Sequence, residues 1–137
     1  MTVARTDVVT VDNEASLADV ARVMTERAVG SVVVVDDEGA PVGMVTDRDL
    51  VTYGLAADRD PEKTIANEIL APNPVTADVE DEILEVTQLM ADERLRRVPI
   101  VDGETLAGIV TLDDVVSLLA AELGNLASVV EAESPSG

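Results

Sequence analysis

GMVTDRDL, the stretch Gly43–Leu50, has a second copy in this chain, GIVTLDDV at Gly108–Val115. In each copy an apolar strand candidate ends in a threonine, and an aspartate follows three positions later, where a helix is expected to begin. The hydroxyl and the carboxylate can cap that helix. They can also hold the hydroxyls and phosphates of a nucleotide whose negative charge faces the helix N-terminus. The motif therefore predicts two strand-to-helix turns with either a structural or a binding role.

The units around these turns repeat as well. A spacing of 66 residues relates three matched pairs: Val9 with Val75, Met24 with Met90, and Asp36 with Asp102. After the second hairpin, which is one residue shorter, Gly108 follows Gly43 at a spacing of 65. A slip of one residue inside a turn is what a duplicated unit predicts.

Hydrophobic periodicity predicts a strand, a helix, two strands and a helix in each unit. In the first unit these are strand 8–11, helix 16–27 with a Ser16 cap and a stop at Gly30, strands 31–35 and 41–46, and helix 47–55. A short helix from Pro61 to Leu70 is expected before the second unit. Residues 115–130 form a further apolar helix, available to the core or to a dimer surface. Residues 1–7 are expected to be loosely held and 131–137 disordered.

A unit of roughly 55–60 residues buries too little surface to be stable alone. The predicted fold is therefore α+β and sandwich-like, with two βαββα repeats packed sheet to sheet in pseudo-twofold symmetry. The expected boundaries are 1–66 for the first repeat with its lead-in, 67–127 for the second repeat with its C-terminal helix, and 128–137 for the tail. Met24 and Met90 are expected to fill the two halves of the core.

Composition excludes several classes of protein. The chain is 47% hydrophobic with no Phe, no Trp and one Tyr, so its core is aliphatic and rich in valine. No apolar run approaches the roughly 18–20 residues that cross a bilayer, and no signal pattern is present, so the expected location is the cytoplasm. With no Cys and no His, the commonest general bases and metal ligands are missing, and an enzyme is not expected. Turn and helix-start preferences explain the acidic pairs Asp36-Asp37 and Asp113-Asp114 better than a metal site does.

Net charge is −19, with only nine basic residues. Nucleic-acid binding requires clustered Lys and Arg, so a nucleic-acid partner is excluded. The acidic balance is similar to that of proteins from extreme halophiles, whose self-repelling surfaces are relieved by concentrated salt. An acidic protein from a low-salt environment is the alternative.

Over about residues 3–125 the chain resembles a tandem cystathionine-β-synthase-type (CBS) domain, the pair also called a Bateman module. The markers in the first half are GSVVVVD at Gly30–Asp36 followed by Gly43–Leu50. The second half repeats them as RVPIVD at Arg97–Asp102 followed by Gly108–Val115. The family binds adenine nucleotides, and sometimes S-adenosylmethionine or NAD, in clefts between the two halves. Its members regulate an attached or separate partner, and they commonly form dimers through their helices.

The resemblance implies two composite clefts, each with an aspartate on the ribose hydroxyls, a threonine near the phosphates and valine side chains around the adenine. One cleft takes Thr46, Arg48, Asp49, Val75, Thr76, Ala77, Leu95, Arg96, Arg97 and Val98. The other takes Thr111, Asp114, Val9, Thr10, Val11, Val29, Gly30 and Ser31. No cofactor is expected, and whether Mg²⁺ accompanies the phosphates is left open.

The clefts differ at one junction, because Gly30-Ser31 in the first half corresponds to Arg96-Arg97 in the second. Guanidinium groups bind phosphate bidentately. The Asp49 cleft, helped by Arg48 or Arg97, is therefore expected to be the better nucleotide site, while Arg96 can reach the neighbouring one. Alternatively, these arginines pair with surface acids, the two motifs only cap their helices, and the chain is a ligand-independent assembly module.

Overall fold

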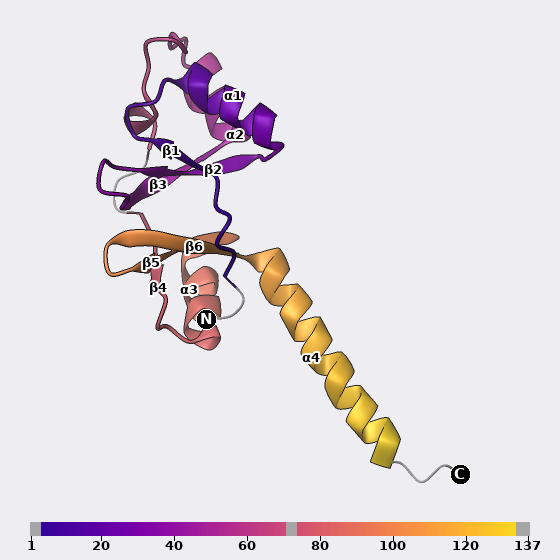
Figure 1. Ribbon diagram of the computed structural model, residues 1–137. Helices are drawn as coiled ribbons and strands as arrows, with labels where there is room; N and C mark the ends of the chain where they lie inside the picture. Colours follow the sequence, from indigo (N-terminus) through magenta and orange to yellow (C-terminus); the bar gives the residue numbers. More distant parts are fainter. Residues whose placement is uncertain (1–3, 71–73, 134–137) are drawn as a thin grey trace.

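The computed structural model describes residues 4–70 and 74–133. Two three-stranded sheets face each other across the middle of the molecule, as Figure 1 shows. The first holds β1 (Thr10–Asp12), β2 (Ser31–Val35) and β3 (Pro41–Thr46); the second holds β4 (Ala77–Asp78), β5 (Arg97–Asp102) and β6 (Thr105–Thr111). In each sheet the first strand runs parallel to the second, and the second antiparallel to the third. The predicted mixed fold of two repeats with the same topology is confirmed.

Helices cover the outer face of each sheet, while one long helix extends away from the second sheet (Figure 1). The first repeat carries α1 (Leu17–Arg27) and α2 (Asp47–Asp49), which continues as the π-helix η1 (Leu50–Leu55). The 3₁₀ helix η2 (Ala66–Glu68) follows. The second repeat carries α3 (Ile83–Glu93) and the long α4 (Leu112–Glu133).

Each repeat has its own aliphatic core between its sheet and its helices. The first core is built from Val11, Val20, Met24, Val32, Val34, Val45 and Ala66, and the second from Ala77, Val86, Met90, Val98, Ile100, Val110 and Val115. The core role of both methionines is confirmed. Because side chains alternate along a strand, Val33 points away from the first core and into the space between the sheets, where it lines a cavity.

The first helix has its expected end, but a different residue caps it. The Ser16 cap is confirmed, since its Oγ accepts from the Asp19 amide at 3.1 Å. The helix ends at Arg27 as expected, but its C-cap is Ala28, which takes the left-handed conformation at φ 54°, so the stop expected at Gly30 was wrong.

The helix expected from Pro61 to Leu70 was also wrong, because only η2 forms there. The carbonyl groups of Pro61 and Thr64 accept from the amides of Ala18 and Leu17, both at 2.9 Å. These carbonyls thus satisfy free donors at the start of α1, and the segment follows α1 instead of forming a full helix of its own.

The segment before β1 crosses to the other repeat. Arg5 forms an isolated antiparallel bridge with Ile109 on β6, with N···O distances of 2.8 and 2.9 Å, and Ala4 packs against the second core. Gly108 permits this approach, because a Cβ there would lie 2.5 Å from the Arg5 carbonyl oxygen. The expectation that residues 1–7 are loosely held was therefore wrong for the part that the structure describes.

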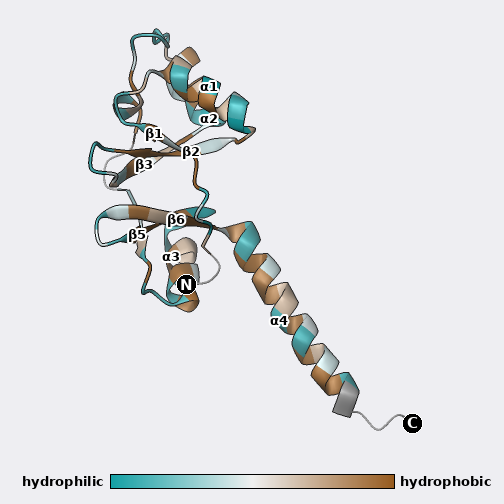
Figure 2. Ribbon diagram, in the orientation of Figure 1, coloured by the Kyte–Doolittle hydropathy of each residue, from teal (hydrophilic) through white to brown (hydrophobic). Residues whose placement is uncertain are grey.

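Helix α4 leaves the body of the molecule, whereas its counterpart in the first repeat does not (Figure 1). In the first repeat the buried Gly54 brings η1 close to α1, where a Cβ on Gly54 would be 3.3 Å from Leu17 Cδ1. The residue 65 positions later is Leu119, which is too large for such an approach. The helix continues to Glu133, past the disordered tail expected from Glu131, and 134–137 lie outside the described residues. Apolar residues recur along it, as Figure 2 shows.

Candidate functional site

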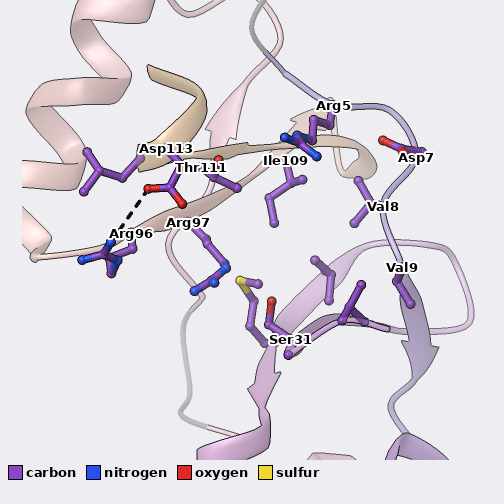
Figure 3. A pocket seen from close by; sticks show the side chains of 15 residues that line it. Arg5, Asp7, Val8, Val9, Ser31, Arg96, Arg97, Ile109, Thr111 and Asp113 are labelled. Carbon is purple, nitrogen blue, oxygen red and sulfur yellow. Dashed lines mark ion pairs between the residues drawn. The ribbon is translucent and has the colours of Figure 1, made fainter. Parts of the chain in front are cut away.

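A cavity of about 310 Å³ lies between the two repeats. It is lined by Arg5, Asp7, Val8, Val9, Val29, Gly30, Ser31, Val33, Met44, Arg96, Arg97, Ile109, Thr111, Leu112 and Asp113. Valine, methionine and isoleucine side chains form one part of the wall, and charged side chains gather near the start of α4 (Figure 3). Its volume is within the range of small-molecule sites, roughly 300–1,000 Å³.

The two strand-to-helix turns are built alike. The Asp47 amide donates to the Gly30 carbonyl at 2.9 Å, and the Leu112 amide donates to the Arg96 carbonyl at 2.7 Å. These bonds connect the start of α2 and of α4 to the strand beside each of them. Gly30 and Arg96 therefore occupy equivalent positions in the two repeats, as the repeat spacing predicts.

Two hydrogen bonds join the first and last residues of the Thr46–Asp49 turn. Thr46 Oγ accepts from the Asp49 amide at 3.1 Å, and Asp49 Oδ2 accepts from the Thr46 amide at 2.9 Å. This reciprocal arrangement is a capping box. In this structure the Asp49 carboxylate accepts a hydrogen bond from the backbone of its own turn.

The Thr111–Asp114 turn has only half of that arrangement. Thr111 Oγ accepts from the Asp114 amide at 3.2 Å. The Asp114 carboxylate instead accepts two hydrogen bonds from Arg5, from Nε to Oδ2 at 2.8 Å and from Nη2 to Oδ1 at 2.7 Å. The hydrogen bonds from Arg5 are the largest influence on the pKa of Asp114 and hold it below its usual value, against an opposing effect of burial.

Three of the nine basic residues of the chain line this one cavity: Arg5, Arg96 and Arg97. Arg97 points into the space between the sheets, toward Ser31 (Figure 3). Arg96 lies at the rim, where its Nη2 is 3.9 Å from Asp113 Oδ1 and both side chains are exposed. A pair this exposed contributes little to stability. The arrangement leaves guanidinium groups available to an anion.

The cavity brings together seven of the residues singled out in the sequence: Val9, Val29, Gly30, Ser31, Arg96, Arg97 and Thr111. Arg96 and Arg97 thus both face the Thr111 turn rather than the Thr46 turn that was expected to be the better site. Four other candidates are in the cores or packed on them: Val11 in the first core, and Ala77, Leu95 and Val98 in the second.

The remaining candidates lie apart from the lining of this cavity. Asp114 is held behind Arg5. Thr46, Arg48, Asp49, Thr10, Val75 and Thr76 are likewise not among the described residues that line it.

Arg5 is one of the eight lining residues that were not predicted as site residues, and the one that binds Asp114. The polar segment around it gives no periodic signal, and its partner Asp114 is 109 positions away. A single clue was available, since any arginine is notable in a chain of net charge −19.

Metal ligands do not gather in the part of the chain that the structure describes: no group of three or more His, Cys, Asp or Glu side chains there could hold an ion. No helix within residues 4–70 and 74–133 is long and apolar enough to cross a membrane.

Two copies of one α/β repeat that face each other across a shared, arginine-lined cavity define a paired-repeat α/β module. A family model described as "CBS domain" matches residues 2–56 and 66–121. The chain therefore belongs to the CBS domain family and carries two copies of the domain.

Relatives of known sequence or structure agree with this assignment. The uncharacterized protein MK0525 of Methanopyrus kandleri is 37% identical over 117 residues, which cover 85% of this chain and 60% of that protein. The chain thus spans less than two thirds of that relative. Hypoxic Response Protein I, whose crystal structure has two coordinated zinc ions, is similar at a TM-score of 0.77 and 32% identity, over 84% of this chain and 93% of the other. The cytosolic domain of the Mg²⁺ channel MgtE, in complex with ATP, is similar at a TM-score of 0.73 and 30% identity, over 84% of this chain and 46% of the other.

Proposed function

We propose that this protein is a regulatory module that binds an adenine nucleotide in the cavity between its repeats and signals the bound state to a partner protein. The observation that carries the proposal is the gathering of Arg5, Arg96 and Arg97 around one cavity in a chain of net charge −19. Phosphate accepts bidentately from guanidinium groups, and the exposed pair of Arg96 with Asp113, at 3.9 Å, is weak enough to yield to it. A catalytic role is not part of the proposal.

The proposed orientation of the nucleotide follows from the side chains that line the cavity. The phosphates lie toward Arg96 and Arg97, near Thr111 and the N-terminus of α4, where the helix dipole favours negative charge. The adenine lies against the apolar wall formed by Val9 and Val29. The similarity to the MgtE domain in complex with ATP supports this choice of ligand class. S-adenosylmethionine is a poorer candidate, because its sulfonium cation would face three arginines; NAD carries phosphates and stays an alternative.

Isothermal titration with AMP, ADP, ATP, NAD and S-adenosylmethionine, with and without Mg²⁺, tests this function. The expected result is binding of at least one adenine nucleotide, and weaker binding by the variant Arg97→Gln. The matched control is Arg27→Gln, which removes the same charge from the outer end of α1. Absence of heat from every ligand, with protein shown to be folded, contradicts the proposal.

A ligand-independent assembly module is the second candidate function. It is favoured by the fact that both predicted ribose carboxylates have internal partners, Asp49 in its capping box and Asp114 on Arg5. Under that function, Asp49→Ala and Asp114→Ala change stability without changing any binding.

The signal is proposed to pass through a homodimer formed by α4. Val116, Leu119, Leu123 and Leu126 are spaced alternately three and four residues apart, and each is more than half exposed. This is the apolar spacing of a two-stranded coiled coil, with β-branched Val116 at an a position and Leu119 and Leu126 at d positions. The helix has 22 residues and a length of roughly 33 Å, and it extends clear of the body (Figure 1). A second copy can therefore align with it.

High salt is proposed as the working environment, in the cytoplasm of a halophile. At net charge −19 the carboxylates repel one another, and the repulsion falls as ionic strength rises. Thermal unfolding in a series of KCl concentrations tests this; a melting temperature that does not rise with salt contradicts it.

A further inference from the structure

Arg5 reaches the second repeat from the start of the first and binds both oxygens of the Asp114 carboxylate through one edge of its guanidinium, Nε and Nη2, at 2.8 and 2.7 Å. A bidentate arginine uses one lone pair on each carboxylate oxygen, in the plane of the group. The two neighbouring hydroxyls of a ribose that bind the carboxylate bidentately would approach the same side of it. Arg5 and a ribose are therefore competitors for Asp114.

The backbone holds Arg5 in this position independently of its side chain. Arg5 exchanges two backbone hydrogen bonds with Ile109, and the neighbouring Gly108 leaves space for its carbonyl group. The guanidinium itself is open to solvent, since the Arg5 side chain is 61% exposed, whereas that of Asp114 is 18% exposed. The side chain can thus leave the carboxylate while the segment stays attached to β6.

At the Asp49 turn, no equivalent competitor is found among the residues that the structure describes. The spacing of 66 residues places Ala71 at the repeat position of Arg5, although Ala71 lies outside the described residues. A methyl side chain cannot bind a carboxylate, and the matching Asp49 caps its own turn instead. The Arg5–Asp114 pair is consequently a property of the arginine-lined cavity, which Arg5 also lines.

We propose that Arg5 is a specificity-determining residue that competes internally for the ribose-binding carboxylate, so that a ribonucleotide enters by displacing the Arg5 guanidinium from Asp114. The inference depends on the proposed function, because it concerns how that cavity takes a nucleotide. The displaced guanidinium stays at the cavity wall, where only a ligand that brings its own negative charge can replace the lost carboxylate. Competition by Arg5 for Asp114 therefore favours phosphorylated adenosyl ligands over adenosine.

The test compares ATP with 2′,3′-dideoxy-ATP, which lacks the competing hydroxyls, on the full chain at several salt concentrations. The ratio of the two dissociation constants measures the ribose contact. In the variant Arg5→Gln, the dissociation constant of 2′,3′-dideoxy-ATP divided by that of ATP is expected to rise about two- to fivefold. This is the range expected from the free energy of an exposed ion pair. The rise becomes smaller at high salt, because salt screens the wild-type pair.

Three control variants define the outcomes. Arg27→Gln changes net charge equally and leaves the ratio at its wild-type value. Arg5→Lys, which cannot bind bidentately, gives an intermediate ratio. Asp114→Asn in the Arg5→Gln background abolishes the gain.

An unchanged ratio in Arg5→Gln, with ATP still bound, overturns the role of Arg5 and leaves the proposed function standing. An equal rise of the ratio in Arg27→Gln also overturns it, since the change would then come from net charge and not from the Asp114 contact. Absence of ATP binding in every folded variant overturns the proposed function, and the role of Arg5 with it.

Discussion

Gly54 packs against Leu17 so closely that a Cβ on the glycine would lie 3.3 Å from Leu17 Cδ1. This contact joins η1 to α1 in the first repeat, and the second repeat replaces the glycine with Leu119. One helix therefore returns to its repeat, while the other extends away with its apolar side chains exposed. The change from Gly54 to Leu119 is thus one of the differences between a repeat whose helix packs back on it and a repeat whose helix presents a surface.

The variant Gly54→Leu copies the second-repeat residue into the first. Overpacking against Leu17 is expected to lower the free energy of unfolding by about 1–3 kcal/mol. Urea unfolding followed by circular dichroism measures it. The control is Gly124→Ala, because no atom lies within 4 Å of a Cβ placed at that exposed helical position; it should be neutral or stabilising by up to about 1 kcal/mol. Equal stability of Gly54→Leu and wild type would show that the contact does not hold η1.

The glycines Gly43 and Gly108 occupy one repeat position but tolerate a methyl group differently. A Cβ on Gly108 meets the backbone oxygen of Arg5 at 2.5 Å, whereas on Gly43 it meets the end of the Leu70 side chain at 3.1 Å. Gly108→Ala is expected to lower the free energy of unfolding by about 1–3 kcal/mol. Gly43→Ala is expected to lower it clearly less, since a leucine methyl group can move.

Amide hydrogen exchange gives the local measurement for that pair of variants. The Ile109 amide donates to Arg5 and should exchange faster in Gly108→Ala only. Equal protection of Ile109 in the two variants would contradict the close approach.

Acid should weaken the pair formed by Arg5 and Asp114. The pKa of Asp114 is lowered in the folded protein, chiefly by the hydrogen bonds from Arg5. A lowered carboxyl pKa contributes stability that is present above the unfolded-state pKa, about 3.9, and is lost as pH falls through the folded-state pKa. Wild type should therefore be more stable than Arg5→Gln at pH 7, and the difference should vanish in acid.

An NMR titration of the Asp114 carboxyl carbon checks the cause directly. Its midpoint should move to higher pH in Arg5→Gln and remain in place in Arg27→Gln. A midpoint that is the same in all three proteins would mean that Arg5 does not hold this carboxylate in solution.

The α4 dimer should dissociate when charge is placed on its apolar face. Leu123→Glu is expected to convert a particle of two chains into single chains, because two carboxylates would meet where two leucines packed. Sedimentation equilibrium in high salt measures the mass. Ala121→Glu adds the same charge two positions earlier, on the opposite side of the helix, and should leave the mass unchanged. A wild-type mass equal to that of one chain would contradict the proposed dimer.

Much of the architecture could be predicted from local patterns. Alternating and helical spacing of valine, leucine and methionine located most strands and helices, because burial of one face imposes a period on the sequence. The repeat spacing then implied two equivalent units, and the hydrogen bonds at Gly30 and Arg96 agree with it. The Pro61–Leu70 segment was misread because its carbonyls are used by α1, a tertiary demand that intrinsic preference does not contain.

The candidate site was less predictable than the fold. Seven of its residues were named from the sequence, but Arg97 was expected to help the Asp49 cleft and lines the cavity beside Thr111, where only Arg96 was expected to reach. Arg5 was not foreseen, since 109 residues separate it from Asp114. Which cavity a long side chain enters depends on how the sheets face each other, and a repeat pattern does not specify that packing.

The amino-acid sequence alone determined that this chain forms two matching βαββα repeats with aliphatic cores, because hydrophobic period and turn chemistry act between near neighbours. The packing of one repeat on the other determined where its cations gather, what holds Asp114 and why α4 extends into solvent. Those features arise from contacts between residues far apart in the chain, and such contacts exist only once both sheets are in place.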